Sequence, residues 1–367
     1  MKEDLVLKRF IVIIIMLGFL IGITPKVNAQ ENQNKEINAD AYVVIDSKTG
    51  EILLEKNKNK THFPASITKI VTAIIAIEER NLNEIVTISQ HAQNTVGSSL
   101  SLVAGDKIIL RDLLYGVMLH SGNDGAVAIA EHISSGETEF SKKMTSFAKS
   151  IGANNTNFTN ASGLPNDNHY TTANDMAIIT RYAMENKIFK EIVQHKQYTW
   201  DNRLWRDTLE EHEKVDASRL GIPWEGKPQI INHNRLLDLY KGATGVKNGF
   251  THEARYTLVG SAEKNGIKII SVLLRSKDSD TGYNDMINLL DGGFKIYEEK
   301  ENNLVVNHED EVISEDKELS RTEEKNIQTQ SNLVINKKND NSTLRLGILS
   351  ILSAAIILLL VIKSKKK

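Results

Sequence analysis

Residues 62–80 have the sequence HFPASITKIVTAIIAIEER, and this stretch decides the fold. Beyond Lys69 nearly every side chain up to Ile77 is apolar, which predicts a helix buried on all sides at the centre of a domain. Pro64 stands just before this helix, where proline is favoured. Ser66 and Lys69 are three residues apart, so they are expected on one face of the same turn.

The lysine in this turn suggests chemistry. Because the rest of the helix is apolar, the Lys69 amine would be desolvated, which lowers its pKa and lets the neutral amine act as a base. The start of a helix also offers free N–H groups beside the Ser66 oxygen, and such donors can stabilise an oxyanion. The alternative is a helix-capping Ser66 with Lys69 reaching solvent, and the pair alone leaves both interpretations open.

The Ser-x-x-Lys pattern is weak by itself, because this chain contains it five times. The copy at Ser66 is the one that opens a buried helix. The others fall on a polar helix, at the end of a strand, in an acidic segment and in a basic terminus, where no catalytic face is expected: Ser146/Lys149, Ser261/Lys264, Ser314/Lys317 and Ser364/Lys367.

Two further motifs bear on this pair, since S-x-x-K, S-x-N and K-T-G together mark a class of serine acyl-transfer enzymes. Ser121-Gly122-Asn123 interrupts two apolar helical runs, and alone it is most simply a turn. A perfect K-T-G, Lys48-Thr49-Gly50, lies between the first two strand-like runs, where Gly50 suits a turn. An imperfect copy, Lys247-Asn248-Gly249, lies late in the chain.

Composition excludes several classes of protein. The chain has no cysteine, which excludes disulfides, thiol catalysis and cysteine-based zinc sites. Its ten histidines form no H-E-x-x-H pattern, so a metalloprotease has no support. The net charge of −2 gives no reason to expect nucleic acid as a partner. We expect no metal and no cofactor.

The order of elements indicates the fold class. Strand-like runs stand at both ends of the domain and helical runs stand between them, which predicts an α+β fold with a sheet covered by helices. The strand-like runs are 41–46, 51–56, 255–263 and 267–275, and the helical runs are 66–80, 111–120, 124–133, 171–186 and 283–299.

The N-terminal end has the features of an export signal. Lys8-Arg9 precede the apolar run 10–24, and the small residue Ala29 follows it. This pattern predicts a secretory signal peptide over residues 1–29. A retained N-terminal anchor is the alternative, and both place the following domain, residues 30–300, outside the cell.

The C-terminal end predicts a membrane tether. Residues 301–343 are charged and poor in aromatics, as in a disordered polar stalk. Residues 344–363 contain an apolar run long enough to span a bilayer. The basic tip, residues 364–367, is expected in the cytoplasm by the positive-inside rule. The chain is therefore predicted to be a single-pass protein of the cell membrane with an extracytoplasmic domain.

Three segments that contain the S-x-x-K, S-x-N and K-T-G-like motifs follow one another along the chain in that order: PASITKIVTA (64–73), HSGNDGAVAIAEHI (120–133) and GVKNGFT (245–251). Together they resemble the active-site motifs of the serine-type D-Ala-D-Ala carboxypeptidases, the low-molecular-mass penicillin-binding proteins. DSKTGEILLEKN, NFTNASGLPNDNHYTTANDMAIITRYAM and INHNRLL are similar to that family too, and the resemblance spans about residues 38–298. It implies a β-lactamase/transpeptidase-like fold, with an antiparallel sheet covered by helices and a helical subdomain.

The resemblance also implies roles. Ser66 would attack the carbonyl between the two D-alanines of a peptidoglycan pentapeptide stem, Lys69 would take its proton, and Ser121 would relay a proton to the departing amine. β-Lactams would be trapped on Ser66. Substrate binding is implied for the remaining residues of the motifs, with an oxyanion site between the N–H groups of Ser66 and Phe250: Asn123, Lys247, Asn248, Gly249 and Phe250. Arg275, at the end of a strand, is a further candidate to meet the substrate carboxylate.

One position departs from the family pattern, because Asn248 stands where Thr or Ser is usual. Asparagine is longer and presents an amide N–H, so we expect substrate preference or rate to change. A D,D-endopeptidase, a β-lactamase and a non-catalytic penicillin-binding wall sensor remain open as alternatives. A β-lactamase needs a deacylating Glu-Asn pair between the second and third motifs, and Glu185-Asn186 falls at the end of a predicted helix.

Overall fold

The computed structural model describes residues 36–200 and 229–300, and every structural statement below concerns these residues. Five strands form one sheet in the order β2-β1-β9-β8-β7, and every neighbouring pair is antiparallel. The early and late strands meet where Val43 pairs with Val272. The four strand-like runs of the sequence are confirmed, and they pair as two antiparallel hairpins, β1 with β2 and β8 with β9. The strand bounds are β1 Ala41–Asp46, β2 Ile52–Lys56, β7 Ala243–Thr251, β8 Arg255–Lys264 and β9 Ile267–Ser276.

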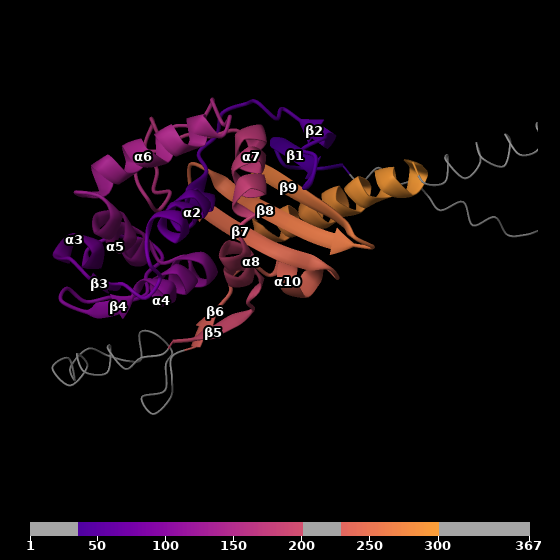
Figure 1. Cartoon of the computed structure of the whole chain (residues 1–367). Helices are drawn as coiled ribbons and strands as arrows, with labels where there is room; N and C mark the ends of the chain where they lie inside the picture. The colour runs from indigo at the N-terminus through magenta and orange to yellow at the C-terminus, as the bar shows by residue number, and fades with distance from the viewer. Residues whose placement is uncertain (1–35, 201–228, 301–367) are drawn as a thin grey trace, which may run out of the picture. The chain divides into compact units, whose positions relative to one another are not determined.

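Helices cover both faces of this sheet (Figure 1). On one face α7 (Ala173–Ala183) packs on β1 and β9, and α8 (Lys187–Gln194) packs on β7. On the other face lies a closing helical segment, residues 279–294, whose Met286 side chain contacts the backbone at Gly260. The antiparallel sheet with helices on it is the architecture that the sequence indicated.

A second group of helices is built around α2, which packs against α5, α6, α7 and α8. Residues 69–77 of α2 are all buried, which confirms the prediction of a central helix. Two small antiparallel sheets of two strands each, β3-β4 and β5-β6, lie outside the main sheet. The bounds are α2 Lys69–Glu79, α3 Gln90–Gln93, α4 Leu110–Tyr115, η2 Gly116–His120, α5 Asn123–Ile133, α6 Glu137–Ser150, α10 Leu236–Leu239, β3 Ile85–Thr87, β4 Lys107–Ile109, β5 Gln197–Thr199 and β6 Gln229–Ile231.

The start of the central helix differs from the prediction. Ser66 lies on a 3-10 turn, η1 (Ala65–Thr68), and the α-helix begins only at Lys69. Tertiary contacts hold this turn: the carbonyl of Pro64 accepts a hydrogen bond from Thr257 Oγ1 on β8 (2.9 Å). Ala65 itself takes a left-handed conformation with φ 52°. These contacts favour a 3-10 turn over the expected α-helical turn at Ser66. They come from a distant strand, so the local sequence does not predict them.

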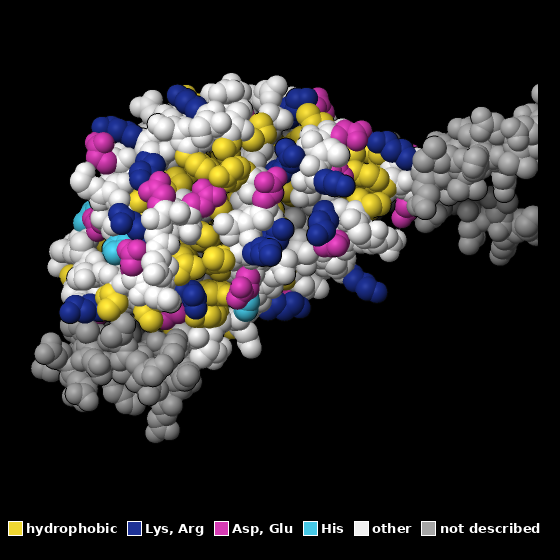
Figure 2. Space-filling model, viewed as in Figure 1, with side chains coloured by type: hydrophobic (Ala, Val, Ile, Leu, Met, Phe, Trp, Pro, Cys, Tyr) yellow, Lys and Arg dark blue, Asp and Glu magenta, His cyan; other side chains and the backbone are white. Residues whose placement is uncertain are grey.

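Charges of both signs are interspersed on the face of the molecule seen in Figure 2. Ion pairs between exposed side chains contribute little to stability, because water screens their charges. The named helices and strands all belong to one compact unit, whose described residues are 36–200 and 229–294.

The predicted signal peptide, stalk, membrane span and basic tip lie outside the described residues: 1–29, 301–343, 344–363 and 364–367. Within residues 36–200 and 229–300, no helix has the length and apolar character needed to cross a membrane.

The buried central helix predicts a large loss of stability on truncation. Ile74 is fully buried in α2, so Ile74→Ala should lower the free energy of unfolding by about 2–5 kcal/mol through lost burial and a cavity. Ile188, 40% exposed on α8, offers a matched control, and Ile188→Ala should change stability by under about 1 kcal/mol. Urea denaturation followed by circular dichroism measures both, and equal losses would contradict the central position of α2.

Candidate active site

The amine of Lys69 lies at the centre of a hydrogen-bond network. Its Nζ is 2.8 Å from Ser66 Oγ, 2.7 Å from Asn123 Oδ1 and 2.6 Å from the carbonyl oxygen of Ser162. The predicted contact between Ser66 and Lys69 is therefore present. A neutral amine has two N–H donors and one lone pair, so it can donate to Asn123 and Ser162 while accepting the Ser66 proton.

Burial sets the protonation state of this amine. Lys69 is fully buried, and desolvation, followed by the nearby positive charge of Lys247, holds the pKa of Lys69 well below its usual value. Asp124 acts in the opposite direction but does not outweigh them. A lowered pKa increases the fraction of the amine that is neutral. Only the neutral amine has a lone pair that can accept a proton from a hydroxyl.

Strand β7 closes the other side of Ser66. A Cβ at Gly249 would lie 2.7 Å from the backbone N of Ser66 and 2.7 Å from Thr257 Oγ1, so only glycine fits there without displacement. Thr257 pairs with Gly249 across β7 and β8 and donates to Pro64. The sheet thus clamps the turn that carries Ser66. The predicted oxyanion donors, the N–H groups of Ser66 and Phe250, belong to these two neighbouring segments.

The second motif also lies at this site. Ser121 ends the π-helical turn η2 in a left-handed conformation (φ 70°, ψ 27°) and is 6% exposed. The helix predicted over 111–120 therefore changes from α to π at Gly116, and such π turns are frequent at functional sites. Asn123 begins α5, and its amide joins Lys69 to the carbonyl of Val96, 2.7 Å from Asn123 Nδ2.

The third motif contributes a second buried lysine. Lys247 is fully buried on β7, and desolvation lowers its pKa to about 7. Its Nζ donates to the carbonyl oxygen of Asn248 (3.0 Å) and lies 3.4 Å from Asn248 Oδ1. The unusual Asn248 thus turns an amide oxygen toward Lys247.

The early K-T-G has a structural role, as expected for a hairpin turn. Asp46 Oδ1 accepts hydrogen bonds from the backbone N–H groups of Lys48 (2.8 Å) and Thr49 (2.5 Å). Gly50 follows with a left-handed φ of 79°. The pair Glu185-Asn186 is structural as well, because Asn186 caps the N-terminus of α8.

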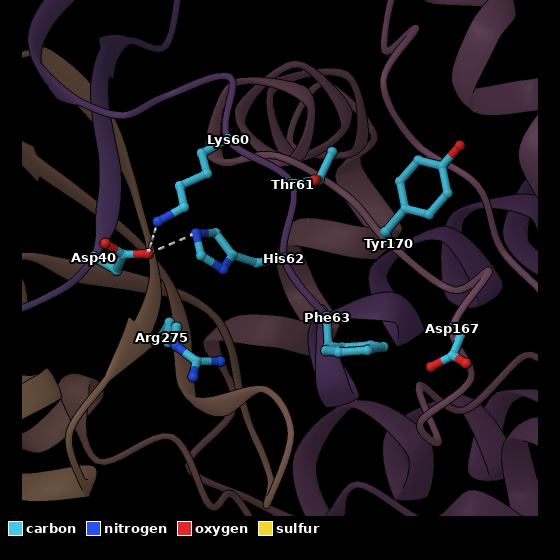
Figure 3. Close-up of a pocket in the computed structure, with 8 residues that line it drawn as sticks. All are labelled: Asp40, Lys60, Thr61, His62, Phe63, Asp167, Tyr170 and Arg275. Carbon is cyan, nitrogen blue, oxygen red and sulfur yellow. Dashed lines mark hydrogen bonds and ion pairs between the residues drawn. The ribbon is translucent and has the colours of Figure 1, made fainter.

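Arg275 lies apart from the Lys69 network. It is exposed at the end of β9 and donates from Nη1 to the carbonyl oxygen of Glu253 (3.0 Å). It lines a cavity together with Phe63 (Figure 3). The structure brings together Ser66, Lys69 and Asn123 directly and places Gly249 against the Ser66 turn.

The motifs did not point to Ser162, whose carbonyl oxygen holds Lys69. Asn160 shapes this loop by accepting hydrogen bonds through Oδ1 from the N–H groups of Gly163 (2.7 Å) and Leu164 (3.1 Å). Gly163 has φ 91°, and a Cβ there would lie 1.9 Å from the carbonyl oxygen of Ala65. The quoted segment NASGLP carried the signal, because Asn and Gly favour such a turn.

His169 and Asp124 were missed as supporting residues. His169 Nε2 lies 2.9 Å from Thr68 Oγ1 in the turn of Ser66, and burial lowers the pKa of His169 to about 3, so the ring is neutral. Asp124, fully buried in the first turn of α5, accepts from the N–H of Leu100 (2.8 Å) and holds the loop between α3 and β4. Both residues support the site indirectly, by holding the segments that they contact in place. The spacing of residues in the sequence does not reveal such contacts.

Residues 27–278 match the family model described as D-alanyl-D-alanine carboxypeptidase, peptidase family S11. The chain belongs to this family. Members include D-alanyl-D-alanine carboxypeptidase DacF of Bacillus subtilis, which is 33% identical over 297 residues, 80% of this chain and 71% of DacF. The D-alanyl-D-alanine carboxypeptidase of Streptomyces sp. strain K15 is 32% identical over 75% of this chain and 93% of its own length.

Solved structures of the family share the fold. The crystal structure of D-alanyl-D-alanine carboxypeptidase DacD from Francisella tularensis superposes with a TM-score of 0.62 at 32% identity, covering 71% of each chain. The Streptomyces K15 DD-transpeptidase gives a TM-score of 0.61 at 30% identity, covering 71% of this chain and 98% of that one. The family fold, a transpeptidase/β-lactamase fold with an antiparallel sheet and helices, is therefore confirmed.

The clamp on Ser66 predicts a sharp effect at Gly249. Gly249→Ala should push β7 away from Ser66 and lower the release of D-alanine from a peptide ending in D-Ala-D-Ala by about 10²-fold. Gly260→Ala is the matched control, since its Cβ would meet the flexible Met286 side chain on the opposite face of the sheet. Similar rates for the two variants would show that the contact at Gly249 is not needed.

Proposed function

We propose that the protein is a serine-type D-Ala-D-Ala carboxypeptidase that trims peptidoglycan stem peptides. The observation that carries this proposal is the buried Lys69 amine, 2.8 Å from the Ser66 hydroxyl and with a strongly lowered pKa. Ser66 itself is half-buried, so a substrate can reach it. Membership of the carboxypeptidase family supports the same activity.

Acylation follows from the network around Lys69. Ser66 Oγ attacks the carbonyl carbon of the penultimate D-alanine, and Lys69 Nζ takes the hydroxyl proton. The oxyanion forms beside the N–H groups of Ser66 and Phe250, which are fixed in advance by the clamp of β7 on the turn. Ser121 passes its proton to the nitrogen of the leaving D-alanine as the bond from that nitrogen to the carbonyl carbon breaks. Ser121 takes back a proton from the Lys69 ammonium, which leaves Lys69 neutral for the second half of the cycle.

Deacylation uses the same groups in the second half of the cycle. Water attacks the ester carbon on Ser66, Lys69 takes a proton from the water, and the Ser66 oxygen leaves and regains a proton. The products are the shortened stem peptide and free D-alanine. Asn123, held by Lys69 and Val96, is placed to hydrogen-bond the peptide backbone.

The Lys247 charge provides recognition of the substrate. A buried ammonium attracts a carboxylate strongly because little water screens it. Lys247 would therefore bind the terminal carboxylate of the peptide, together with the amide of Asn248.

The place of action is part of the proposal. The predicted export signal and the predicted span at 344–363 would hold the catalytic domain outside the membrane, where peptidoglycan lies. β-Lactams resemble the D-Ala-D-Ala end and would acylate Ser66 without ready release. These points rest on the sequence.

The direct test is release of D-alanine from a pentapeptide ending in D-Ala-D-Ala. Ser66→Ala should reduce the rate by at least about 10⁴-fold, because the nucleophile is removed. Ser146→Ala changes the exposed serine of another Ser-x-x-Lys pair on α6 and should match the wild type.

Other outcomes separate the alternatives. Equal D-alanine release by the wild type and Ser66→Ala would remove Ser66 from the mechanism. Covalent labelling by penicillin without D-alanine release would identify a sensor, and rapid repeated hydrolysis of nitrocefin would identify a β-lactamase. Cleavage of cross-linked peptides in preference to pentapeptides would identify an endopeptidase.

The two lysines predict a bell-shaped pH dependence of kcat/KM. Lys69 acts only when neutral, so activity falls as pH drops below its lowered pKa. Lys247 binds a carboxylate only when charged, so activity falls as pH rises through about 7. A bound carboxylate raises the pKa of Lys247, so the alkaline limb of kcat should lie at higher pH than that of kcat/KM. Superimposable alkaline limbs in measured pH–rate profiles would contradict this assignment.

A further inference from the structure

Two histidines meet beside the second and third motifs. His120 is the last residue of η2 and directly precedes Ser121, and His233 lies in the segment between β6 and α10. Their ring centroids are 4.3 Å apart, and the ring planes are tilted by 48°. The positive charge of Lys247 acts on both rings, so the pair lies on the side of the site that β7 forms.

The backbone of both histidines is fixed by hydrogen bonds. The N–H of His233 donates to the carbonyl oxygen of Leu119 (2.9 Å), the residue before His120. The carbonyl oxygen of His233 accepts from Tyr283 Oη (3.3 Å). Two ligands that are held in this way lose little conformational freedom when they bind the same ion, which favours binding.

The side chains of this pair have no polar partner. Within residues 36–200 and 229–300, neither ring makes a hydrogen bond or an ion pair. Most other histidines in that part of the chain differ, because a carboxylate, a hydroxyl or a backbone oxygen contacts the ring: His62, His91, His132, His169 and His195. The nitrogens of His120 and His233 are therefore available to a ligand.

The protonation state of the pair suits metal binding. Desolvation lowers the pKa of His120, while Asp124 acts in the opposite direction and Lys247 in the same one. Desolvation, together with the charges of His120 and Lys247, lowers the pKa of His233 to about 4. Both rings are therefore neutral at pH 7, and the neutral imidazole is the form that binds a metal ion.

An ion can reach this pair from solvent and bind both rings. His233 is exposed and His120 is half-buried. Each Zn–N bond is about 2.0–2.1 Å long, so two nitrogens on one tetrahedral ion lie about 3.3 Å apart. Rings with centroids 4.3 Å apart reach this separation by rotation of the side chains, without movement of the backbone.

The two imidazoles would be the whole ligand set that the described residues supply. Residues 36–200 and 229–300 contain no group of three or more His, Cys, Asp or Glu side chains arranged to hold a metal ion. The other positions of a four-coordinate ion are then left to water. Such a site binds its ion reversibly, unlike a structural zinc site with four protein ligands.

We propose that His120 and His233 form a site for a divalent transition metal ion such as Zn²⁺ or Cu²⁺, and that an ion bound there slows the release of D-alanine. Imidazole nitrogen suits these ions, whereas Mg²⁺ and Ca²⁺ prefer oxygen. Because His120 directly precedes Ser121, the ion and its bound water restrict the approach of a peptide to the proton relay. The slowing rests on the proposed carboxypeptidase function, whereas the metal site does not.

The test of the site is a calorimetric titration of the metal-free full chain with Zn²⁺ alone. His233→Gln and His120→Gln should each weaken Zn²⁺ binding by at least about tenfold, since each removes one of the two ligands. Cu²⁺ should bind the wild type more tightly than Zn²⁺, as the general order of affinities requires. Mg²⁺ should not bind the pair.

His252→Gln is the matched control. His252 is exposed just after β7, and its ring contacts Phe250 rather than a second histidine. Loss of this histidine should leave the Zn²⁺ affinity unchanged.

The effect on activity is measured as D-alanine release from a peptide ending in D-Ala-D-Ala. In the wild type, Zn²⁺ should lower kcat/KM with a midpoint equal to the calorimetric dissociation constant. His233→Gln should keep its activity without zinc and should need at least about ten times more Zn²⁺ for the same loss.

Three results would overturn the proposal or one part of it. Equal Zn²⁺ affinity in the wild type, His233→Gln and His120→Gln would place any bound ion elsewhere. Zn²⁺ bound at the pair without a change in kcat/KM would overturn the inhibition. Absence of D-alanine release from the zinc-free wild type would overturn the proposed function and with it the inhibition, and calorimetry would still decide the metal site.

Discussion

The site depends on the desolvation of one amine. Lys69 is fully buried in the first turn of the central helix, where water cannot stabilise its charge, so its pKa falls and its lone pair is available to Ser66. Burial of a lysine is costly unless its hydrogen bonds are satisfied. The carbonyl of Ser162 and the amide of Asn123 satisfy them, and neither brings a full negative charge that would return the proton to Lys69.

Much of the surrounding structure holds these partners in place. Gly163 allows the loop of Ser162 to approach Ala65 closely, and the neutral ring of His169 ties the same loop to Thr68. On the opposite side Gly249 allows β7 to reach the backbone of Ser66. Because glycine has no side chain, Gly163 and Gly249 allow two separate segments to contact the turn of Ser66. The conformation of this turn therefore depends on close backbone contacts more than on local helix propensity.

A second buried lysine adds a constraint on charge. Lys247 has a pKa of about 7, and its charge contributes to the low pKa of Lys69. The lowered pKa of Lys69 favours its neutral form, whereas Lys247 populates both its neutral and its charged form near pH 7. A substrate carboxylate would favour the charged form of Lys247, so binding and base strength are coupled through one electrostatic interaction.

The sequence by itself determined the α+β class, the central apolar helix, both long hairpins and the pairing of Ser66 with Lys69. These features depend on short-range spacing: apolar periodicity defines α2, and a step of three residues on a helical turn brings a serine next to a lysine. The order of the three motifs also indicated the family. Local rules worked wherever the interacting groups lie within one element or one hairpin.

Only the tertiary structure decided the rest. The 3-10 turn at Ser66, the π turn before Ser121, the carbonyl of Ser162 on Lys69 and the cavity of Arg275 all join segments that are far apart in the chain. The number of residues between such segments does not give their distance in space. Burial lowers the pKa of both lysines, and it depends on how the whole domain packs. The two K-T-G-like motifs also differ in their tertiary position, because one lies in an outer hairpin turn and the other lies against the turn of Ser66.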